Sequence, residues 1–461
     1  MRERKVKPRL AFLHAHLAGR PCYHGHPVSS GPERSRLPSR AGSPRILRDP
    51  VTITLDGEPV LAERGEPVAA ALVAAGKLML ARSPKFHRPR GPSCMRAACD
   101  GCLARVDEAP NVMTCMVAAA EGTAVVSQNR LGPRETDLLR MTDWFFPDGM
   151  NHHELFAGIP GVQGVMQAFA RRVAGLGRMP TEVEAPHPAA RRSADVVIVG
   201  AGPSGMAVAS RLAQRGRAVE IIDDQLAPGG GLTALGAADA QAFDEIYASC
   251  MELVKSGRIR MRSSTIAGGM YGRDLLVVGP QGAEVLEAQA LVLACGAHDG
   301  ALAFEGNDVP GVMSARAAGW LLARGVSVGK RIVVVMTAGG GPFGASFAAA
   351  AEGAAEVRLV EGEPLRIRGA SHVKAVVVRD ASGKDTEHKA DAVLIDAPRS
   401  PAYELAEQAG ARMAHEPRGF VVQTDAGLVA EGIYAVGEMT GTAFEPRAIT
   451  EEAARVSARL G

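Results

Sequence analysis

The sequence of 461 residues predicts a chain of mixed α+β and α/β class, in which a small N-terminal unit precedes two nucleotide-binding units. Three observations predict this arrangement. A strand–strand–helix pattern at residues 51–76 runs into a cysteine-rich loop, and glycine-rich turns at residues 200–205 and 339–344 each stand between an apolar strand and a helix. A chain of this length can hold about three domains with cores of their own.

The charge is unevenly distributed along the chain. Residues 1–50 hold eleven Lys and Arg against three Asp and Glu, whereas the remaining residues hold 41 against 47. The basic charge therefore belongs to the N-terminal tail and gives no support to nucleic-acid binding by the rest of the chain. Because residues 1–49 are rich in Arg, Pro, Ser, Gly and His and lack periodicity, we expect a disordered tail, with a targeting peptide or a wrongly chosen start codon as equal alternatives. No apolar run approaches the ~20 residues of a membrane-spanning helix, so no direct membrane span is expected.

Residues 50–130 form the first predicted domain. Apolar and polar residues alternate at 51–55, the chain turns at Asp56 and Gly57, and a second strand follows, which together predict a β-hairpin. The apolar run 67–76 then predicts a helix with a glycine at its end. Two strands and a helix followed by a cysteine loop are typical of the β-grasp arrangement, so we expect that fold here.

Four of the seven cysteines are closely spaced, in the pattern C-x4-C-x2-C-x12-C: Cys94, Cys99, Cys102 and Cys115. Such a set could hold zinc, form disulfides or bind an iron–sulfur cluster. Zinc sites usually pair cysteines two by two, and a disulfide framework is unusual in a chain this long. The asymmetric spacing instead matches the opening of the plant-type [2Fe–2S] pattern. We therefore predict a [2Fe–2S] cluster, an electron-transfer role and a reducing compartment, the cytoplasm.

Two stretches outside these motifs allow more than one interpretation. The basic run Lys85–Gly91 could face a flavin or its phosphates, or it could be a solvated turn, and charge alone favours neither. Residues 131–193 contain several helical segments without a chemical motif and predict a helical linker. Within it, His152 and His153 are better interpreted as linker residues than as metal ligands.

The first glycine-rich turn carries the pattern of a dinucleotide site. An apolar strand at 196–199 leads into it, a helix follows, and the next strand, 219–222, ends at an acidic residue. The glycines permit a tight turn and close approach of a pyrophosphate, the helix N-terminus favours phosphate, and the carboxylate can accept ribose hydroxyls. The residues predicted to bind the dinucleotide are Gly200, Gly202, Pro203, Ser204, Gly205 and Asp223.

Two later stretches favour FAD over NAD at this first site. Residues 291–298 resemble the segment by which flavoproteins with two dinucleotide domains return to their FAD domain, with Cys295 where Thr is usual. Residues 432–438 resemble their late strand, with Glu438 where Asp is usual. A closing helix from Phe444 would direct its N-terminus toward the flavin. No substrate base is evident beside the flavin, so the catalytic residues stay unknown. The predicted FAD domain comprises 194–310 and 395–461, with Gly230, Gly296, Gly437 and Glu438 as further cofactor-binding residues.

The second glycine-rich turn, within a predicted NAD-type domain at 311–394, fits the same pattern less well. Glu361 follows the first glycine at a distance that suits an adenosine ribose and would repel a 2′-phosphate, so NAD(H) is expected rather than NADP(H). However, Thr337 and Ala338 lengthen a turn that is normally tight. The alternative is a retained fold with an empty or remodelled site. The predicted contacts are Gly339, Gly341, Gly344 and Glu361.

Taken together, these motifs resemble the α subunit of heteromeric sarcosine oxidase and its relatives, which include chains of opine oxidase, hydroxyproline dehydrogenase and hydrogen cyanide synthase. The resemblance covers residues ~51–461 and is carried by the basic run, the cysteine loop, the first glycine turn and residues 296–313. It implies that a partner β subunit with its own FAD oxidises an amine or imino acid, while this chain carries electrons toward an acceptor. Folate chemistry is not implied, because the chain stops where its sarcosine oxidase counterpart would continue into a folate-binding half.

Three hypotheses follow for the function. The first is an electron-transfer subunit of a heteromeric amine, opine or imino-acid dehydrogenase or oxidase. The second is a self-sufficient NADH-dependent flavin and iron–sulfur reductase, and the third is a scaffold or redox sensor in which the cluster is structural. A disulfide reductase is not expected, because residues 228–236 lack the cysteine pair that such enzymes place there.

Overall fold

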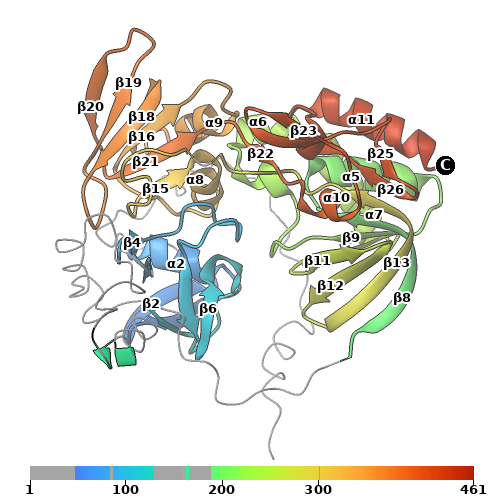
Figure 1. Ribbon diagram of the computed structural model, residues 1–461, viewed down its shortest axis with the longest axis horizontal. Helices are drawn as coiled ribbons and strands as arrows, with labels where there is room; N and C mark the ends of the chain where they lie inside the picture. The colour runs from blue at the N-terminus through green and yellow to red at the C-terminus, as the bar shows by residue number, and fades with distance from the viewer. Residues whose placement is uncertain are drawn as a thin grey trace, which may run out of the picture.

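The computed structural model describes residues 47–83, 87–128, 188–300 and 302–461, together with five positions between 159 and 165. It divides into three units around three sheets (Figure 1). Most of the predicted tail and of the predicted linker lies outside the described residues, as do Lys85, Phe86, His152 and His153. Among the described residues, no helix is long and apolar enough to cross a membrane.

The first unit is a five-stranded sheet with one helix packed on it. Its elements are β1 (Pro50–Leu55), β2 (Glu58–Glu63), α2 (Val68–Ala74), β5 (Leu103–Val106), β6 (Ala109–Met113) and β7 (Ala124–Val126). The strand order is β2-β1-β7-β5-β6, with β1 and β7 parallel and the other pairs antiparallel. Val51, Ile53 and Leu55 alternate into the core beside the buried face of α2. The predicted β-grasp fold is confirmed.

The second unit contains the first glycine turn. Its central strands are β8 (Ala190–Val199), β9 (Val219–Ile222), β10 (Ile259–Arg262), β13 (Gly282–Leu293) and β26 (Ile433–Ala435), all parallel, while β11 (Ile266–Tyr271), β12 (Asp274–Gly279) and β25 (Leu428–Ala430) pair antiparallel. Helices α5 (Pro203–Gln214), α7 (Asp244–Lys255) and α11 (Pro446–Arg459) pack together beside this sheet. Buried apolar residues form the last four positions of β8 and, apart from Glu220, all of β9, because both faces of a parallel sheet are covered.

The third unit repeats the strand–turn–helix–strand pattern on a smaller scale. Its parallel sheet, in the order β15-β21-β16-β17, consists of β15 (Val312–Ser314), β21 (Ala392–Asp396), β16 (Arg331–Met336) and β17 (Glu356–Glu361). Helices α8 (Ala315–Leu322) and α9 (Phe343–Ala350) pack on it. The antiparallel strands β18 (Glu363–Arg368), β19 (Ala375–Arg379) and β20 (Asp385–Lys389) form a separate sheet at the outer end of this unit (Figure 1).

Short elements connect these units and complete their edges. They are β3 (Ala81–Arg82), β4 (Pro89–Arg90), η2 (Thr114–Met116), η4 (Gly230–Ala234), α6 (Ala237–Gln241), β14 (Ala297–His298), β22 (Ser400–Pro401), α10 (Glu404–Gln408), β23 (Met413–Glu416), β24 (Gly419–Val422) and η5 (Gly437–Thr440).

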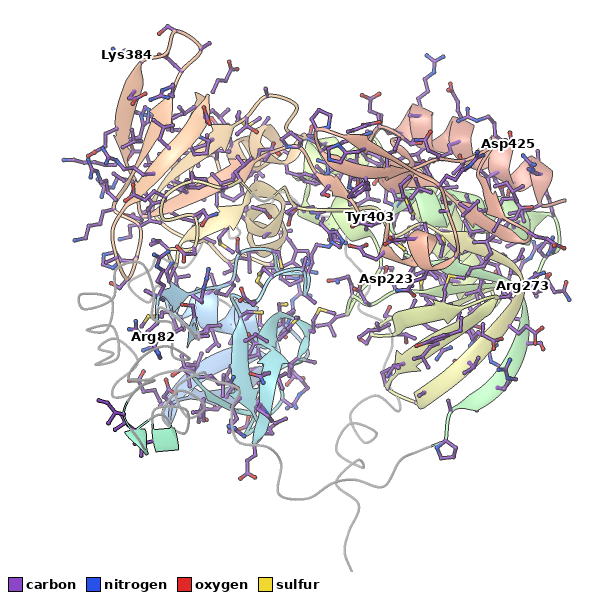
Figure 2. All side chains as sticks on the ribbon, viewed as in Figure 1. Arg82, Asp223, Arg273, Lys384, Tyr403 and Asp425 are labelled. Atoms are coloured by element: carbon purple, nitrogen blue, oxygen red, sulfur yellow. The ribbon has the colours of Figure 1, made fainter. Side chains whose placement is uncertain are left out.

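The cysteine-bearing unit lies against both nucleotide-type units. On the side of the third unit, the Ser314 amide donates to the carbonyl of Ser93 at 3.0 Å, and Arg90 pairs with Asp308 at 3.3 Å. On the side of the second unit, the Gln225 amide group contacts the Met116 sulfur at 4.0 Å. Asp223, at the end of β9, lies on the side of its sheet that faces the first unit (Figure 2). The cysteine loop and the first glycine turn therefore meet at one interface.

Candidate cofactor site

The four predicted cluster cysteines are brought together as two pairs of free thiols. Cys94 is hydrogen-bonded to Cys99, and Cys102 is hydrogen-bonded to Cys115. The thiol of Cys94, by donating to Cys99, lowers the pKa of Cys99 to about 6, and its own pKa is raised in turn. In the second pair, the pKa of Cys102 is likewise lowered by its hydrogen bond with Cys115. One thiol of each pair therefore has a lowered pKa, which favours the thiolate form that metal ligation requires.

The backbone of the cysteine loop is shaped to surround the sulfurs. Met95 and Ala97 adopt left-handed conformations, with φ of 54° and 58°. As a result, the Arg96 amide donates to Cys94 Sγ and the Ala97 amide donates to Cys115 Sγ, both at 3.4 Å. A side chain on Gly101 would place its Cβ 2.0 Å from the Gly91 carbonyl oxygen, so only glycine fits there.

This donor set fits a [2Fe–2S] cluster. Among the residues that the structure describes, no three His, Cys, Asp or Glu side chains converge on one point as ligands of a single metal ion would. Two thiol pairs instead suit two irons that each take two protein sulfurs and share inorganic sulfides. The amides that point at Cys94 and Cys115 would stabilise the negative charge of the ligated sulfurs.

A cavity of about 230 Å³ lies next to the cysteine loop. Its walls combine the first glycine turn, the end of β9, the segment after β13 and the η5 region with the cysteine loop itself. The lining includes Arg96, Ala98, Gly200, Gly202, Pro203, Ser204, Asp223, Gly230, Cys295, Gly296, His298, Arg316, Glu404, Gly437, Glu438 and Phe444. Of the residues predicted for the first site, Gly205 alone is absent from the wall, because it packs behind the turn.

The three glycines of the first turn have separate roles. A Cβ on Gly200, which has a φ of +110°, would lie 2.3 Å from the Ala294 carbonyl oxygen, and a Cβ on Gly205 would lie 2.0 Å from the Gly200 carbonyl oxygen. These two glycines therefore allow the strand, turn and helix to pack closely. Gly202 has an ordinary φ of −76° and nothing within 4 Å of its would-be Cβ, so this position leaves space for a cofactor.

Asp223 is buried at the end of β9 and is held by its own loop. Its carboxylate accepts hydrogen bonds from the Ala201 amide at 2.6 Å and the Gln225 amide at 2.9 Å. Burial, together with the neighbouring Asp224, raises the pKa of Asp223 to about 6. Each carboxylate oxygen keeps a further lone pair, which suits the predicted contact with ribose hydroxyls.

In the η5 part of the cavity wall, Glu438 is held by an arginine. Glu438 Oε1 lies 2.6 Å from Arg399 Nε, and both side chains are largely buried. The Gly437 amide donates to Glu452 at 2.7 Å, which fixes the turn with its positive φ of 87°. At the cavity rim, His298 pairs with the carboxylate of Glu404 at 2.9 Å. Sequence reasoning gave no role to Arg96, Arg316 or Arg399, because no local motif marks them.

Cys295, which replaces the usual Thr, also lines the cavity. Burial raises the pKa of its thiol to about 12, so at neutral pH it is a neutral and unreactive group.

The second glycine turn has the expected elements, but its amides are already engaged. The backbone amides of Gly341 and Gly344 donate to the two carboxylate oxygens of Asp396 at 3.0 and 2.7 Å. A Cβ on Gly341 would also lie 1.8 Å from Arg399 Nη1, so the arginine fills the space over the turn. Gly339 and Glu361 are exposed, at the start of the turn and at the end of β17. The protein's own carboxylate thus occupies the place at which such a turn would hold a phosphate.

Comparison with known proteins finds family models for two parts of the chain. Residues 48–130 match the family model of the 2Fe-2S iron-sulfur cluster binding domain, and residues 194–372 match that of the pyridine nucleotide-disulphide oxidoreductases. The alpha subunit of sarcosine oxidase from Rhizobium meliloti (strain 1021) is 30% identical over 66% of this chain and 33% of its own length. Its counterpart from Corynebacterium sp. (strain U-96) is 29% identical over 67% of this chain and 30% of its own length.

The overall fold is shared with a solved structure. The match to the crystal structure of L-proline dehydrogenase from P. horikoshii has a TM-score of 0.67 and 20% sequence identity. It covers 91% of this chain and 74% of the chain of the proline dehydrogenase. The chain spans about a third of the length of the curated relatives that it matches. Over about two thirds of its length the chain is similar to the sarcosine oxidase alpha subunits, and it joins a domain that matches the 2Fe-2S iron-sulfur cluster binding family to one that matches the pyridine nucleotide-disulphide oxidoreductases.

Proposed function

We propose that the chain is the electron-transfer subunit of a heteromeric FAD-dependent dehydrogenase or oxidase that acts on amines, opines or imino acids. In this proposal an amine-oxidase-like β subunit with its own FAD oxidises the C–N bond, and this chain carries the electrons toward an acceptor. One observation carries the proposal: the loop that holds the cluster cysteines also forms a wall of the dinucleotide cavity, through Arg96 and Ala98.

The residues of the cavity support FAD binding at the first site. Gly200, Gly202 and the start of α5 would receive the pyrophosphate, and Asp223 a ribose. FAD, when bound, accepts two electrons and releases them singly, which couples hydride chemistry to a one-electron cluster. Met116, next to Cys115, contacts Gln225 of the cavity wall at 4.0 Å, so the segment that carries Cys115 contacts the cavity wall.

The polar groups of the cavity support the division of labour between two polypeptides. Asp223 is held by two backbone amides, Glu438 by Arg399, and Arg316 by Asp299 at 2.6 Å. These groups bind and orient a cofactor better than they abstract a proton from a substrate, because each is already engaged. We therefore assign amine oxidation to the partner, and we propose the cytoplasm as the compartment because free thiols are retained there.

The alternative, a self-sufficient NADH-dependent reductase, is less well supported. It needs nicotinamide dinucleotide at the second glycine turn, where Gly339, Gly341, Gly344 and Glu361 stay proposed contacts. Binding there would require Asp396 to release two amides. We expect this to disfavour NADH, since a phosphate would have to displace a buried carboxylate of the same charge.

The proposal is tested by isolating the tagged full-length chain with and without its partner. The chain alone should show flavin and [2Fe–2S] absorbance but no dye reduction with a panel of sarcosine, proline, hydroxyproline and opines. The complex isolated from the source cells should contain a second flavoprotein and reduce the dye with one of these substrates. Turnover by the chain alone would refute the division of labour.

A further inference from the structure

We propose that Arg96 of the cluster loop is a dinucleotide-binding residue that one domain supplies to the cavity of another, and that cluster and dinucleotide consequently bind cooperatively. This inference uses the assignment of the cavity to a dinucleotide but is independent of the partner, the amine substrate and the direction of electron flow.

The side chain of Arg96 reaches out of its own domain. It lines the same cavity as the first glycine turn, and its Nη1 donates to the Ala297 carbonyl oxygen at 3.1 Å. The positive charge of Arg96 acts to lower the pKa of Asp223, because it favours the ionised form of that carboxyl group. Within the described part of the chain, no carboxylate pairs with Arg96, whereas a guanidinium at such a position usually faces an anion.

A second guanidinium, that of Arg316, binds the same carbonyl oxygen as Arg96. Arg316 is buried and donates from Nη2 to the same Ala297 carbonyl oxygen at 2.9 Å. Arg316 is neutralised by Asp299, 2.6 Å away, which in turn accepts the Ser314 hydroxyl. Burial, followed by the charge of Arg96, lowers the pKa of Arg316 to about 10, so the two cations repel each other. An anion near Arg96 would relieve this repulsion, and the pyrophosphate of a dinucleotide offers charged oxygens that a guanidinium can bind in pairs.

The position of Arg96 depends on the conformation of the cluster loop. It lies between the left-handed residues Met95 and Ala97, and its own amide donates to Cys94 Sγ. Ligation of Cys94 would fix this amide and hold the side chain in the cavity. Loss of the cluster would release it, since the loop contains no regular helix or strand between β4 (Pro89–Arg90) and β5. By linkage, a bound dinucleotide must then stabilise the cluster by the same factor.

The first test measures FAD binding to the full-length chain by equilibrium dialysis. Arg96→Gln should weaken FAD binding about 10- to 100-fold, as expected for loss of one charge-assisted contact to phosphate. The FAD affinity of Arg96→Lys should lie between those of Arg96→Gln and the wild type. Arg64→Gln is the control, because Arg64 is an exposed arginine of the same domain that pairs with Asp49. Iron content and circular dichroism verify that cluster and fold are retained. Unchanged FAD affinity in Arg96→Gln would overturn the binding role.

The second test is a double-mutant cycle with Cys99→Ser, which removes a cluster ligand. If cluster and dinucleotide communicate through Arg96, Cys99→Ser should weaken FAD binding, and adding Arg96→Gln should cause little further loss. Conversely, saturating FAD should slow iron release to a chelator about tenfold in the wild type and not in Arg96→Gln. If the losses of FAD affinity caused by Cys99→Ser and Arg96→Gln simply multiply in the double variant, the proposed coupling is overturned. Failure of the wild type to bind FAD would instead refute the cofactor assignment of the proposed function.

Discussion

The Gly344 amide donates to the carboxylate of Asp396 at 2.7 Å, at the start of helix α9. The same carboxylate accepts the Gly341 amide at 3.0 Å. Burial raises the pKa of Asp396, which means that keeping its carboxylate charged costs free energy. The hydrogen bonds from the Gly341 and Gly344 amides offset part of this cost, and a dinucleotide would otherwise use these amides. In the third unit, the amides of the glycine turn are thus occupied by one of the protein's own carboxylates.

We expect NADH to reduce the flavin of the wild-type chain slowly or not at all under anaerobic conditions. Asp396→Ala should free the two amides and raise the affinity for NADH at least about tenfold, while lowering stability by about 1–3 kcal/mol for the unpaired amides. Stopped-flow flavin absorbance and denaturant titration measure the two effects. Asp385→Ala, at an exposed strand of the same unit, is the control. Rapid bleaching of the wild-type flavin by NADH would contradict this prediction.

Substitution of two glycines of the first turn should have different effects, one on FAD binding and the other on folding. Gly202→Ala should fold with nearly wild-type stability but bind FAD at least about tenfold more weakly, because its methyl group meets no protein atom and enters the cofactor space. Gly205→Ala should not give a stable fold, since its Cβ would lie 2.0 Å from the Gly200 carbonyl oxygen. Thermal unfolding and FAD dialysis distinguish the two outcomes. If the two variants had the same stability and the same FAD affinity, the glycines of the turn would not have the separate roles described above.

The pairing of the thiols predicts which cysteines the cluster needs. Cys102→Ser should abolish the [2Fe–2S] absorbance and the reduced-state EPR signal, because one of the two irons loses a protein ligand. Cys250→Ser should leave both signals intact, since Cys250 is buried in α7 near Ser210 and away from the loop. A cluster signal that survives in Cys102→Ser, with full iron content, would contradict the ligand assignment.

Local sequence patterns were sufficient to predict the elements of both sites. The spacing of Cys94, Cys99 and Cys102 and the glycines at 200–205 act through neighbours a few residues away, so short-range spacing reveals their chemistry. The strand–turn–helix elements around them were predicted for the same reason, because periodicity within a segment records which face is buried.

The remaining features depend on contacts between distant parts of the chain. Arg96 meets Ala297 201 positions later, and Asp396 meets Gly344 52 positions earlier. Neither arginine nor aspartate is unusual in its own segment, so no motif could identify them. The lengthened turn at Thr337 was a hint that the second site was altered, but it could not show that Asp396 fills it.

The burial of Asp223 predicts a pH dependence for the chain without bound dinucleotide. Its folded-state pKa is about 6, above the ordinary value of 3.8, so the folded state binds its proton more tightly than the unfolded state does. The associated stability is fully present below about pH 4 and is lost as the pH rises through 6. Between pH 5 and 7.5 the wild type should therefore lose about 1 kcal/mol relative to Asp223→Asn, which cannot ionise.

Denaturant titrations of both proteins at these two pH values measure the difference. Adding saturating FAD should reduce it, because ribose hydroxyls that donate to Asp223 favour the ionised carboxylate and lower its pKa. The same FAD should bind Asp223→Asn more weakly at pH 7.5, where the wild-type carboxylate is charged. A stability difference between wild type and variant that is constant across this range would mean that Asp223 ionises normally, as an exposed carboxylate would, and is not the buried ribose acceptor inferred from the cavity.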